Sequence, residues 1–259
     1  MTLTETNLER YSRNILLPEI GGKGQQKLFS SKVLVVGAGG LGSPIIMYLA
    51  ALGVGNITIV DHDKVELSNL QRQIIHNTEN IGVQKSESAA MFVKKLNPEI
   101  NVTCLNEKLS EKNADILISS HDIIADGSDN FETRYLVADK SFILKKTLVA
   151  AAITKYEGQI STWKSTDEKN DYPCFRCLFP NEPNNSLANN CSSNGVIGSL
   201  GGFMGSLQAT EIIKEILDIG ETMAGYISLY DVLNNNFRKI KINIDPDCYF
   251  CKKYRKNEE

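Results

Sequence analysis

Residues 32–42 read Lys-Val-Leu-Val-Val-Gly-Ala-Gly-Gly-Leu-Gly, an apolar strand pattern that runs directly into a glycine-rich turn. A helical pattern from Pro44 to Leu52 follows, so backbone N–H groups at a helix start are expected to face an anion such as phosphate. The next apolar run, residues 57–60, ends at Asp61, where a carboxylate can accept hydrogen bonds from ribose hydroxyls. This stretch predicts a dinucleotide-type α/β fold, which dehydrogenases and flavoproteins also use.

The composition is that of an ordinary globular protein. The chain has 259 residues, 42% of them hydrophobic, and a formal net charge of −3. That charge provides no field to attract nucleic acid, so functional basic residues must act locally. Residues 1–13 contain no apolar segment typical of a signal peptide, and no uninterrupted apolar run is long enough to span a membrane. We therefore expect a cytoplasmic protein with no nucleic-acid and no membrane partner.

Apolar runs alternate with helical patterns up to residue 153, which predicts a mostly parallel sheet whose carboxyl ends gather ligands along one rim. Beyond Gly158 the pattern alternates, and residues 226–232 and 237–243 flank an Asn-rich turn, which predicts an antiparallel hairpin. The expected fold is a Rossmann-like α/β sheet, mostly parallel and extended by antiparallel strands. Its expected strands are 32–36, 56–60, 101–105, 122–125 and 147–153, and its helices 44–52, 85–96 and 130–144.

Four of the six cysteines form two CxxC pairs, Cys174 with Cys177 and Cys248 with Cys251. Four thiolates at this spacing suit a tetrahedral zinc ion. Two redox pairs or disulfides are the alternative, but a cytoplasmic location disfavours stable disulfides. We expect a zinc site that ties the last part of the chain to its middle.

Cations gather around the predicted nucleotide site. Arg13 lies ahead of the first strand, and Arg72 and Lys85 follow Asp61. A triphosphate that releases pyrophosphate needs its charge neutralised, and nucleotidyl transfer depends largely on such electrostatics and on positioning. Asp129, at the same rim, would then be a natural Mg²⁺ ligand. Taken singly, Arg72 and Lys85 could equally belong to solvated helix ends, and Asp129 could cap a helix.

Taken together, these features resemble the HesA/MoeB/ThiF adenylyltransferase family of the ubiquitin-activating-enzyme superfamily along nearly the whole chain. The resemblance implies a homodimer that uses ATP and Mg²⁺ to adenylate the C-terminal Gly-Gly carboxylate of a ubiquitin-like sulfur carrier of the ThiS or MoaD type. Pyrophosphate would leave, and a thiocarboxylate would form later for thiamine thiazole or molybdopterin synthesis. The matching segments are residues 10–13, 37–42, 61–63, 68–73, Lys85, 126–130, 157–160, both CxxC pairs and 205–209.

The resemblance also implies individual roles. Asp61 would bind the ribose, Asp129 the Mg²⁺, and Arg13 the distal phosphate of the partner subunit's ATP. The catalytic set would be Arg13, Arg72, Lys85 and Asp129. The nucleotide-binding set would be Gly37, Gly39, Gly40, Leu41, Gly42, Asp61, Asp63, Ser68, Asn69, Leu70, Gln71, Arg72, Lys85, Asp129 and Asn130.

Cys191 matches a loop cysteine that in ThiF-like proteins can link covalently to the carrier, although the same position is dispensable for adenylation in other relatives. Its stretch is rich in Asn, Pro and Ser, and no basic residue is adjacent to lower the pKa of the thiol. A covalent role therefore stays open.

We expect one adenylation domain over residues 1–259, with an N-terminal helical arm (1–30), a nucleotide-binding half (31–155) and a half for carrier binding, zinc and dimerisation (156–259). The chain ends soon after Cys251, so no rhodanese domain is expected. Sulfur would then come from a separate donor such as a cysteine desulfurase.

Other functions compete with this interpretation. An NAD-dependent oxidoreductase would explain the glycine turn and Asp61, but not Arg72, Lys85, Asp129 and the CxxC pairs together. A non-catalytic scaffold of the same fold would not need the complete phosphate-facing set. A tRNA-modifying dehydratase also activates a carboxylate with ATP. The CxxC pairs and the near-neutral charge favour the sulfur carrier adenylyltransferase over this dehydratase.

Overall fold

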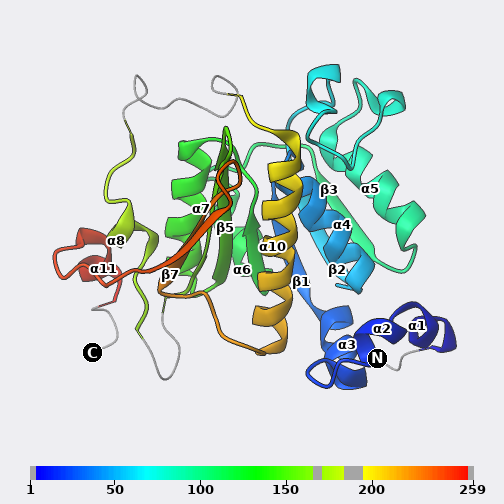
Figure 1. The fold of residues 1–259 in the computed structure, drawn as a ribbon, viewed down its shortest axis with the longest axis horizontal. Coiled ribbons are helices and arrows are strands. Elements are labelled where there is room, and N and C mark those ends of the chain that lie inside the picture. Colours follow the sequence, from blue (N-terminus) through cyan, green and yellow to red (C-terminus); the bar gives the residue numbers. More distant parts are fainter. Residues whose placement is uncertain (1–3, 166–170, 184–194, 256–259) are drawn as a thin grey trace.

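An eight-stranded sheet forms the centre of the computed structural model, which describes residues 4–165, 171–183 and 195–255 (Figure 1). The strand order is β3-β2-β1-β4-β5-β6-β7-β8. The pairs among β1–β5 are parallel, and β6, β7 and β8 add antiparallel pairs, so the predicted architecture is confirmed. The strands are β1 (Lys32–Val36), β2 (Asn56–Val60), β3 (Asn101–Leu105), β4 (Ile123–Asp126), β5 (Thr147–Thr154), β6 (Glu157–Trp163), β7 (Tyr226–Asp231) and β8 (Asn236–Lys241).

Helices cover both faces of this sheet and produce two hydrophobic clusters. One cluster includes residues of α3 (Gly21–Ser30), α4 (Gly42–Leu52), α5 (Lys85–Leu96) and α10 (Gly198–Leu217). The other includes residues of α6 (Ala114–Ser119), α7 (Phe131–Ile143) and α8 (Phe175–Leu178). None of the described helices is both long and apolar enough to cross a bilayer. The remaining elements are α1 (Glu5–Arg10), α2 (Ser12–Ile15), α11 (Tyr249–Tyr254) and the 3-10 turns η1 (Leu67–Asn69) and η2 (Thr78–Asn80).

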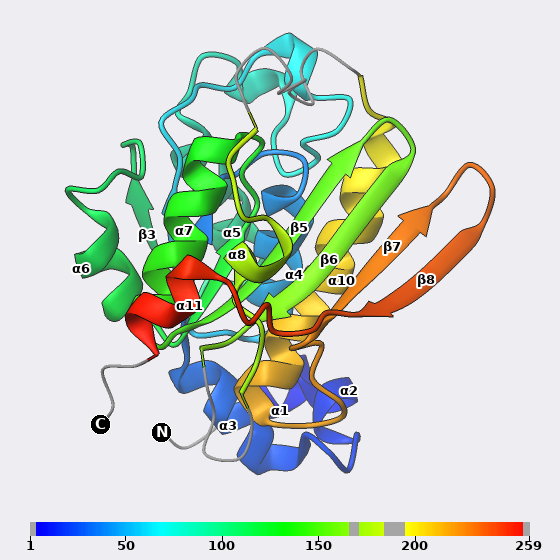
Figure 2. The ribbon, with the colours of Figure 1, turned by 90° about the vertical axis from the view of Figure 1, so that its left-hand side faces the viewer.

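Burial explains why the central and outer strands differ in sequence. In β4 every residue is buried, as expected for a central parallel strand covered on both faces. Every residue of β8 is exposed, and this edge strand carries Arg238, Lys239 and Lys241. Charged side chains on an open edge discourage pairing with another strand. Figure 2 shows the β7–β8 hairpin extending away from the other strands.

The carboxyl ends of the parallel strands meet at one rim. Val36 lies opposite Val60 on one side and opposite Asp126 on the other, and Asp126 in turn pairs with Ala150. The loops that follow β1, β2 and β4 therefore converge. Helices α1–α3 lie at the other end of the sheet (Figure 1).

Helix α10 crosses α4 at close range because it presents glycines to it. A Cβ on Gly201 would lie 2.8 Å from the Gly40 carbonyl oxygen, and one on Gly205 would lie 2.3 Å from Pro44 Cγ and 2.6 Å from the Leu41 carbonyl oxygen. These contacts are shorter than any packed side chain tolerates. Because these glycines have no side chain, α10 can pack closely against the start of α4.

Gly205→Ala is therefore expected to lower the free energy of unfolding by about 1–3 kcal/mol, because the helices must separate to admit the methyl group. Gly202→Ala in the same helix is the matched control, since its Cβ would have no neighbour within 4 Å. That control is expected to be neutral or slightly stabilising, because alanine favours the helix. Denaturant unfolding measures both, and equal effects of the two substitutions would contradict this account of the packing.

Candidate nucleotide-binding and metal sites

The glycine turn after β1 has a backbone conformation that leaves amide groups available to an anion. Gly37 has a φ of +91°, and a Cβ there would lie 3.0 Å from the Gly127 carbonyl oxygen. A Cβ on Gly42 would lie 1.9 Å from the carbonyl oxygen of Gly37. Within the described part of the chain, the amides of Gly39, Gly40 and Leu41 donate no hydrogen bond. Free amides at the start of the 11-residue helix α4 suit a phosphate.

Asp61 joins this turn to the loop that follows β2. One carboxylate oxygen accepts the amide of Ala38 at 2.7 Å, and the other accepts the amide of Asp63 at 2.8 Å. The residue is 8% exposed. Each carboxylate oxygen has a second lone pair, so both remain able to accept a hydroxyl hydrogen bond.

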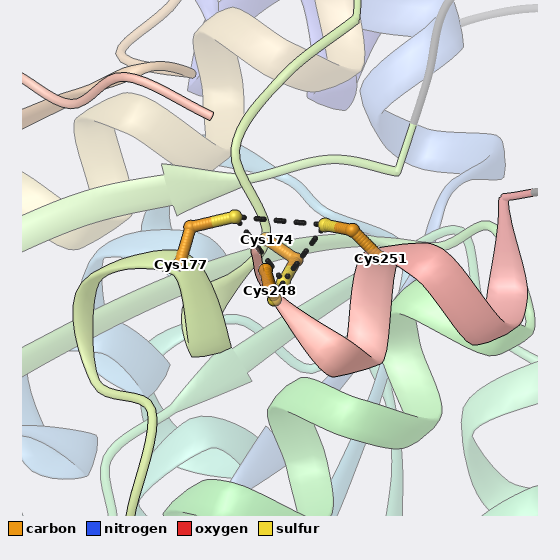
Figure 3. A group of neighbouring side chains, drawn as sticks. All are labelled: Cys174, Cys177, Cys248 and Cys251. Atoms are coloured by element: carbon orange, nitrogen blue, oxygen red, sulfur yellow. Dashed lines mark hydrogen bonds between the residues drawn. The ribbon is translucent and has the colours of Figure 1, made fainter. Parts of the chain in front are cut away.

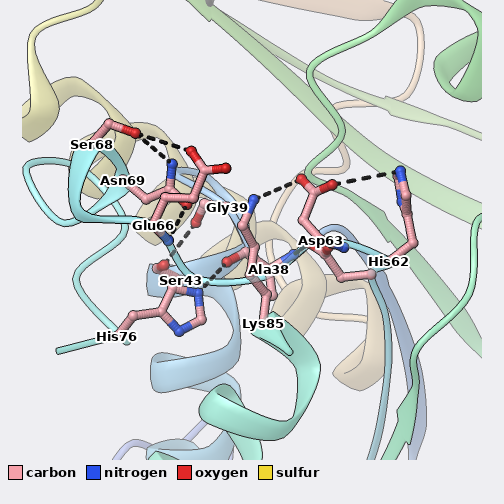
Figure 4. A network of polar contacts seen from close by, with 11 residues as sticks. Ala38, Gly39, Ser43, His62, Asp63, Glu66, Ser68, Asn69, His76 and Lys85 are labelled. Carbon is pink, nitrogen blue, oxygen red and sulfur yellow. Dashed lines mark hydrogen bonds and ion pairs between the residues drawn. The ribbon is translucent and has the colours of Figure 1, made fainter. Parts of the chain in front are cut away.

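Lys85 brings a shielded positive charge to the same rim. It is the first residue of α5, its side chain is 8% exposed, and Nζ lies 2.8 Å from Asp63 Oδ2 (Figure 4). Burial alone would raise the pKa of Asp63, but the hydrogen bond and charge of Lys85 outweigh burial and hold that pKa below its usual value. The Asp63 carboxyl is therefore charged at neutral pH, and its hydrogen bond fixes Lys85 Nζ in position.

Residues 68–73 divide into a supporting part and a part that reaches the cleft. Asn69 Oδ1 accepts the amide of Glu66 at 3.1 Å and so caps η1, and the guanidinium of Arg72 donates to the Ser68 carbonyl at 3.0 Å. Arg72 and Gln73 line a narrow cleft beside the glycine turn. The other residues predicted from this segment do not line it in the described structure, namely Ser68, Asn69, Leu70 and Gln71.

Two cavities meet at the rim. A narrow cleft of about 120 Å³ runs along the glycine turn, Asp61, Asp63, Arg72 and Lys85. A wider groove of about 590 Å³ lies over β5–β8 and the start of α7, with Phe131, Phe179 and Tyr230 among its apolar lining. Four residues line both cavities, namely Asp129, Asn130, Arg134 and Ile153. A nucleotide phosphate in the cleft and the end of an extended chain in the groove would meet at these four residues.

Asp129 is free to bind a cation at this junction. Asn130 caps α7, since its Oδ1 accepts the amide of Thr133 at 2.9 Å, so the alternative that Asp129 is the cap is wrong. The Asp129 carboxylate is exposed and makes no hydrogen bond or ion pair within the described residues.

Arg13 does not lie at the junction of its own subunit. Arg13 is exposed on α2, which packs against the end of α4 through Asn14 and the Leu52 carbonyl. It therefore lies a helix length from the glycine turn at the start of α4 within its own subunit. Cys191 lies outside the described residues.

The four CxxC cysteines come together although their two pairs lie far apart in the sequence (Figure 3). Cys174 and Cys248 each precede a short helix, α8 or α11. The Sγ···Sγ distances are 3.7 Å for Cys174–Cys177, 3.7 Å for Cys174–Cys248, 3.5 Å for Cys177–Cys251 and 3.3 Å for Cys251–Cys174. A Zn–S bond of about 2.3 Å in a tetrahedron requires S···S separations of about 3.8 Å. The donor set and its geometry therefore fit zinc.

The environment of these thiols also favours a bound cation. The hydrogen bond between Cys174 and Cys177 raises the pKa of the Cys174 thiol and lowers that of Cys177 to about 2. One thiolate thus forms readily while its neighbours resist ionisation, because anionic sulfur atoms repel one another. A divalent cation would remove that repulsion and allow all four to bind as thiolates.

Sequence reasoning missed three residues at the rim. Gln73 and Arg134 line the cleft, and His76 contacts the backbone of the glycine turn that borders it. Arg134 follows Asn130 by one helical turn, a spacing that places both on the same face, so the sequence carried a weak signal for it. His76 Nε2 lies 2.9 Å from the Ala38 carbonyl oxygen and Nδ1 lies 2.8 Å from Ser88 Oγ, so the ring ties the glycine turn to α5.

Stability is expected to fall as the pH drops below neutrality, in part because of His76. Burial lowers the pKa of His76 below its usual value near 6.5, and the charge of Lys85 acts in the same direction. The unfolded chain therefore takes up a proton first, and the stability present above pH 6.5 is lost as the pH falls through the lowered folded-state pKa. Denaturant unfolding at pH 7.5 and 5.5 should show a smaller loss in His76→Gln than in the wild type. An identical loss would exclude this role.

Comparisons with known proteins agree with this geometry. The ThiF family matches residues 11–250. A SAMP-activating enzyme E1 of Haloferax volcanii is 44% identical over 251 residues, which cover 97% of this chain and 91% of the relative. A sulfur carrier protein adenylyltransferase of Thermus thermophilus is 41% identical over 252 residues, which cover 97% of this chain and 93% of the relative.

A solved structure shares the fold. Escherichia coli MccB with ATP superposes with a TM-score of 0.81 at 23% identity, and the match covers 96% of this chain and 76% of MccB. Since the ThiF match spans most of the chain and two relatives exceed 40% identity over nearly their full lengths, this protein belongs to the ThiF family of MoeB/ThiF-type, E1-like proteins.

Proposed function

We propose that this chain adenylates the C-terminal Gly-Gly carboxylate of a ubiquitin-like sulfur carrier protein at the expense of ATP. One observation carries the proposal: the phosphate-type cleft and the wider groove meet at Asp129, Asn130, Arg134 and Ile153. Two substrates that must react end to end need such a junction. The names of the Haloferax and Thermus relatives support the same class of reaction.

In the proposed reaction, a carboxylate oxygen of the carrier attacks the α-phosphorus of ATP. The P–O bond between the α- and β-phosphates breaks, and pyrophosphate leaves with the electron pair. The carboxylate is itself the nucleophile, so the enzyme needs to bind and orient rather than to supply a Ser or Cys. Free amides of the glycine turn, Arg72 and Lys85 would oppose the phosphate charge, which is where catalysis of phosphoryl-type transfer mostly arises.

Two metals complete the proposal. Asp129 would hold Mg²⁺, which when bound neutralises charge on the phosphates. The four clustered cysteines would hold zinc, which would stabilise the structure far from the reacting atoms. Asp61 would accept the ribose hydroxyls through its remaining lone pairs.

The position of Arg13 supports a homodimer in which each subunit completes its partner's cleft. Arg13 is exposed and distant from the glycine turn of its own chain, so it can neutralise a distal phosphate only in another subunit. We also propose that residues 1–259 act as one unit with the helical arm, nucleotide and carrier parts described above. A cytoplasmic location with a separate sulfur donor suits free thiolates and ATP. A covalent link through Cys191 is a further step to test.

ATP–pyrophosphate exchange tests the proposal directly. Purified protein with Mg²⁺ is assayed alone, with a ThiS-type carrier and with a MoaD-type carrier, each ending in Gly-Gly. Exchange that requires one carrier supports the proposal and assigns the pathway, thiamine thiazole or molybdopterin. Absence of exchange with both, from protein that still binds ATP, contradicts it. Retention or turnover of NADH would instead favour an oxidoreductase.

A further inference from the structure

Arg134 occupies the junction of the two cavities. It lies on α7, one turn after the capping residue Asn130, and it lines both the nucleotide cleft and the wider groove. Among the four residues that the cavities share, it carries the one positive charge. Its side chain is 12% exposed, so the guanidinium is largely shielded from water yet borders both spaces.

Arg134 is only loosely paired within the protein. Its Nε lies 3.7 Å from Asp126 Oδ2, beyond hydrogen-bond distance, and both atoms are buried without a hydrogen-bond partner among the described residues. Another of its nitrogens, Nη2, donates to the Ser128 carbonyl at 3.0 Å. The guanidinium is thus anchored through Nη2, and its buried Nε faces Asp126, whereas Nη1 donates no hydrogen bond within the described residues.

A second arginine–aspartate pair near the same helix shows what a purely structural pair looks like. Arg176 donates from Nε to Asp139 Oδ1 at 3.1 Å and from Nη2 to Asp139 Oδ2 at 2.7 Å, a two-pronged contact. Asp139 belongs to α7, as Arg134 does. Arg134 differs from Arg176 because Asp126 accepts no hydrogen bond from its guanidinium.

Asp126 explains why the guanidinium stays at the junction. This carboxyl is 0% exposed, burial raises its pKa, and the charge of Arg134 opposes that rise. Its Oδ1 accepts the Ser128 amide at 2.9 Å, so the loop between Asp126 and Asp129 is fixed as well. A charge at this depth holds Arg134 in place by attraction without consuming its donors.

The proposed reaction needs a cation at this point. A carboxylate must approach an α-phosphate, and the two anions repel each other. Arginine binds carboxylates through two parallel hydrogen bonds, which fix orientation as well as charge. A carboxylate that enters from the groove would meet the Nη1 and Nη2 side of Arg134 before reaching the phosphate.

We propose that Arg134 binds the C-terminal carboxylate of the incoming carrier tail and orients it toward the α-phosphate, with Asp126 as the positioning residue behind it. The inference rests on the proposed adenylation. It adds a residue that recognises the end of the tail, so that an acid terminus is distinguished from a neutral one.

A binding cycle tests the contact. Each carrier is prepared with a C-terminal acid and with a C-terminal amide, and Kd is measured with the α,β-methylene analogue of ATP, which prevents adenylate formation. The wild type is expected to bind the acid at least tenfold tighter than the amide. Arg134→Gln should reduce that ratio to about one, and Arg134→Lys should keep part of it, since lysine retains the charge but not the fork. The KM for ATP should change less than twofold.

Controls separate this contact from folding. Arg134→Gln leaves Asp126 as a buried charge without compensation, so the double variant D126N/R134Q removes both charges and should show the same loss of acid preference. Lys140→Gln removes one charge from the same helix, where Lys140 pairs with Glu111 and Asp115, and should keep the preference. A ratio that stays at tenfold in Arg134→Gln, or a wild type without acid preference, overturns the inference. Failure of wild-type exchange with both carriers would instead overturn the proposed function.

Discussion

Replacing Asp129 with alanine is expected to lower ATP–pyrophosphate exchange by about 10³-fold or more, because a positioned cation contributes several kcal/mol to a charged transition state. Asp129 is suited to hold that cation because its carboxylate makes no hydrogen bond or ion pair in the described structure. The neighbouring acids are already engaged, Asp61 by two amides and Asp63 by Lys85. Exchange is measured with saturating Mg²⁺ and carrier.

The variant should remain folded, since an exposed carboxylate without partners contributes little to stability. Asp115→Ala is the matched control. It also removes one exposed aspartate, which pairs with Lys140 on the far part of α7, and it should leave exchange unchanged. Exchange at the wild-type rate in Asp129→Ala would rule out the assigned role.

Removing zinc is expected to give the largest loss of stability. We expect the free energy of unfolding to fall by about 3 kcal/mol, which for a chain of this size lowers the melting temperature by roughly 6–12 °C. Four sulfur atoms at 3.3–3.7 Å would lose the ion that holds them together, and α8 would separate from α11. Calorimetry before and after chelation, with metal content verified, measures the change.

Nucleotide binding should survive the loss of zinc at temperatures below the new transition. The cysteines pack against Phe142 and Phe250 and line neither the cleft nor the groove. Cys251→Ser should reproduce the effect of chelation, whereas Cys104→Ser should not, since Cys104 lies outside the cluster and its hydrogen bond to the Ser86 carbonyl suits a hydroxyl. An unchanged melting curve after verified metal loss would refute a structural zinc.

Much of the fold follows from local sequence patterns. Strands β1, β2 and β3 and helix α5 have the predicted bounds, because short runs rich in apolar and β-branched residues and a clear helical period mark them. The cysteine cluster was also predicted, since CxxC spacing fixes each half of a metal site locally. Helix α6 was missed, and α10 begins at Gly198, through glycines that a propensity argument places outside a helix. Packing against α4 outweighs that propensity.

The candidate site was only partly predictable. The glycine turn, Asp61 and Lys85 can be predicted from the sequence, because they follow a strand or begin a helix. Arg134 and His76 cannot be predicted in this way, because their place in the site depends on contacts with residues remote in sequence. One such contact is the hydrogen bond between His76 and the Ala38 carbonyl. Asn69 does not line the cleft in the described structure, because its side chain accepts the backbone amide of Glu66, the residue before η1.

The unbroken sheet has a consequence for how the substrates could be brought together. Strand β5 pairs with β4 in parallel and with β6 in antiparallel fashion, and its Ile153 borders both cavities. The floor of the cleft and the floor of the groove are therefore parts of one hydrogen-bonded sheet with no hinge between them. Neither half can swing over the other, as lobes do in enzymes that close by domain motion. In the proposed reaction, strand register would set the alignment of the reacting ends, and a slip of one residue in β5 would turn Ile153 to the opposite face.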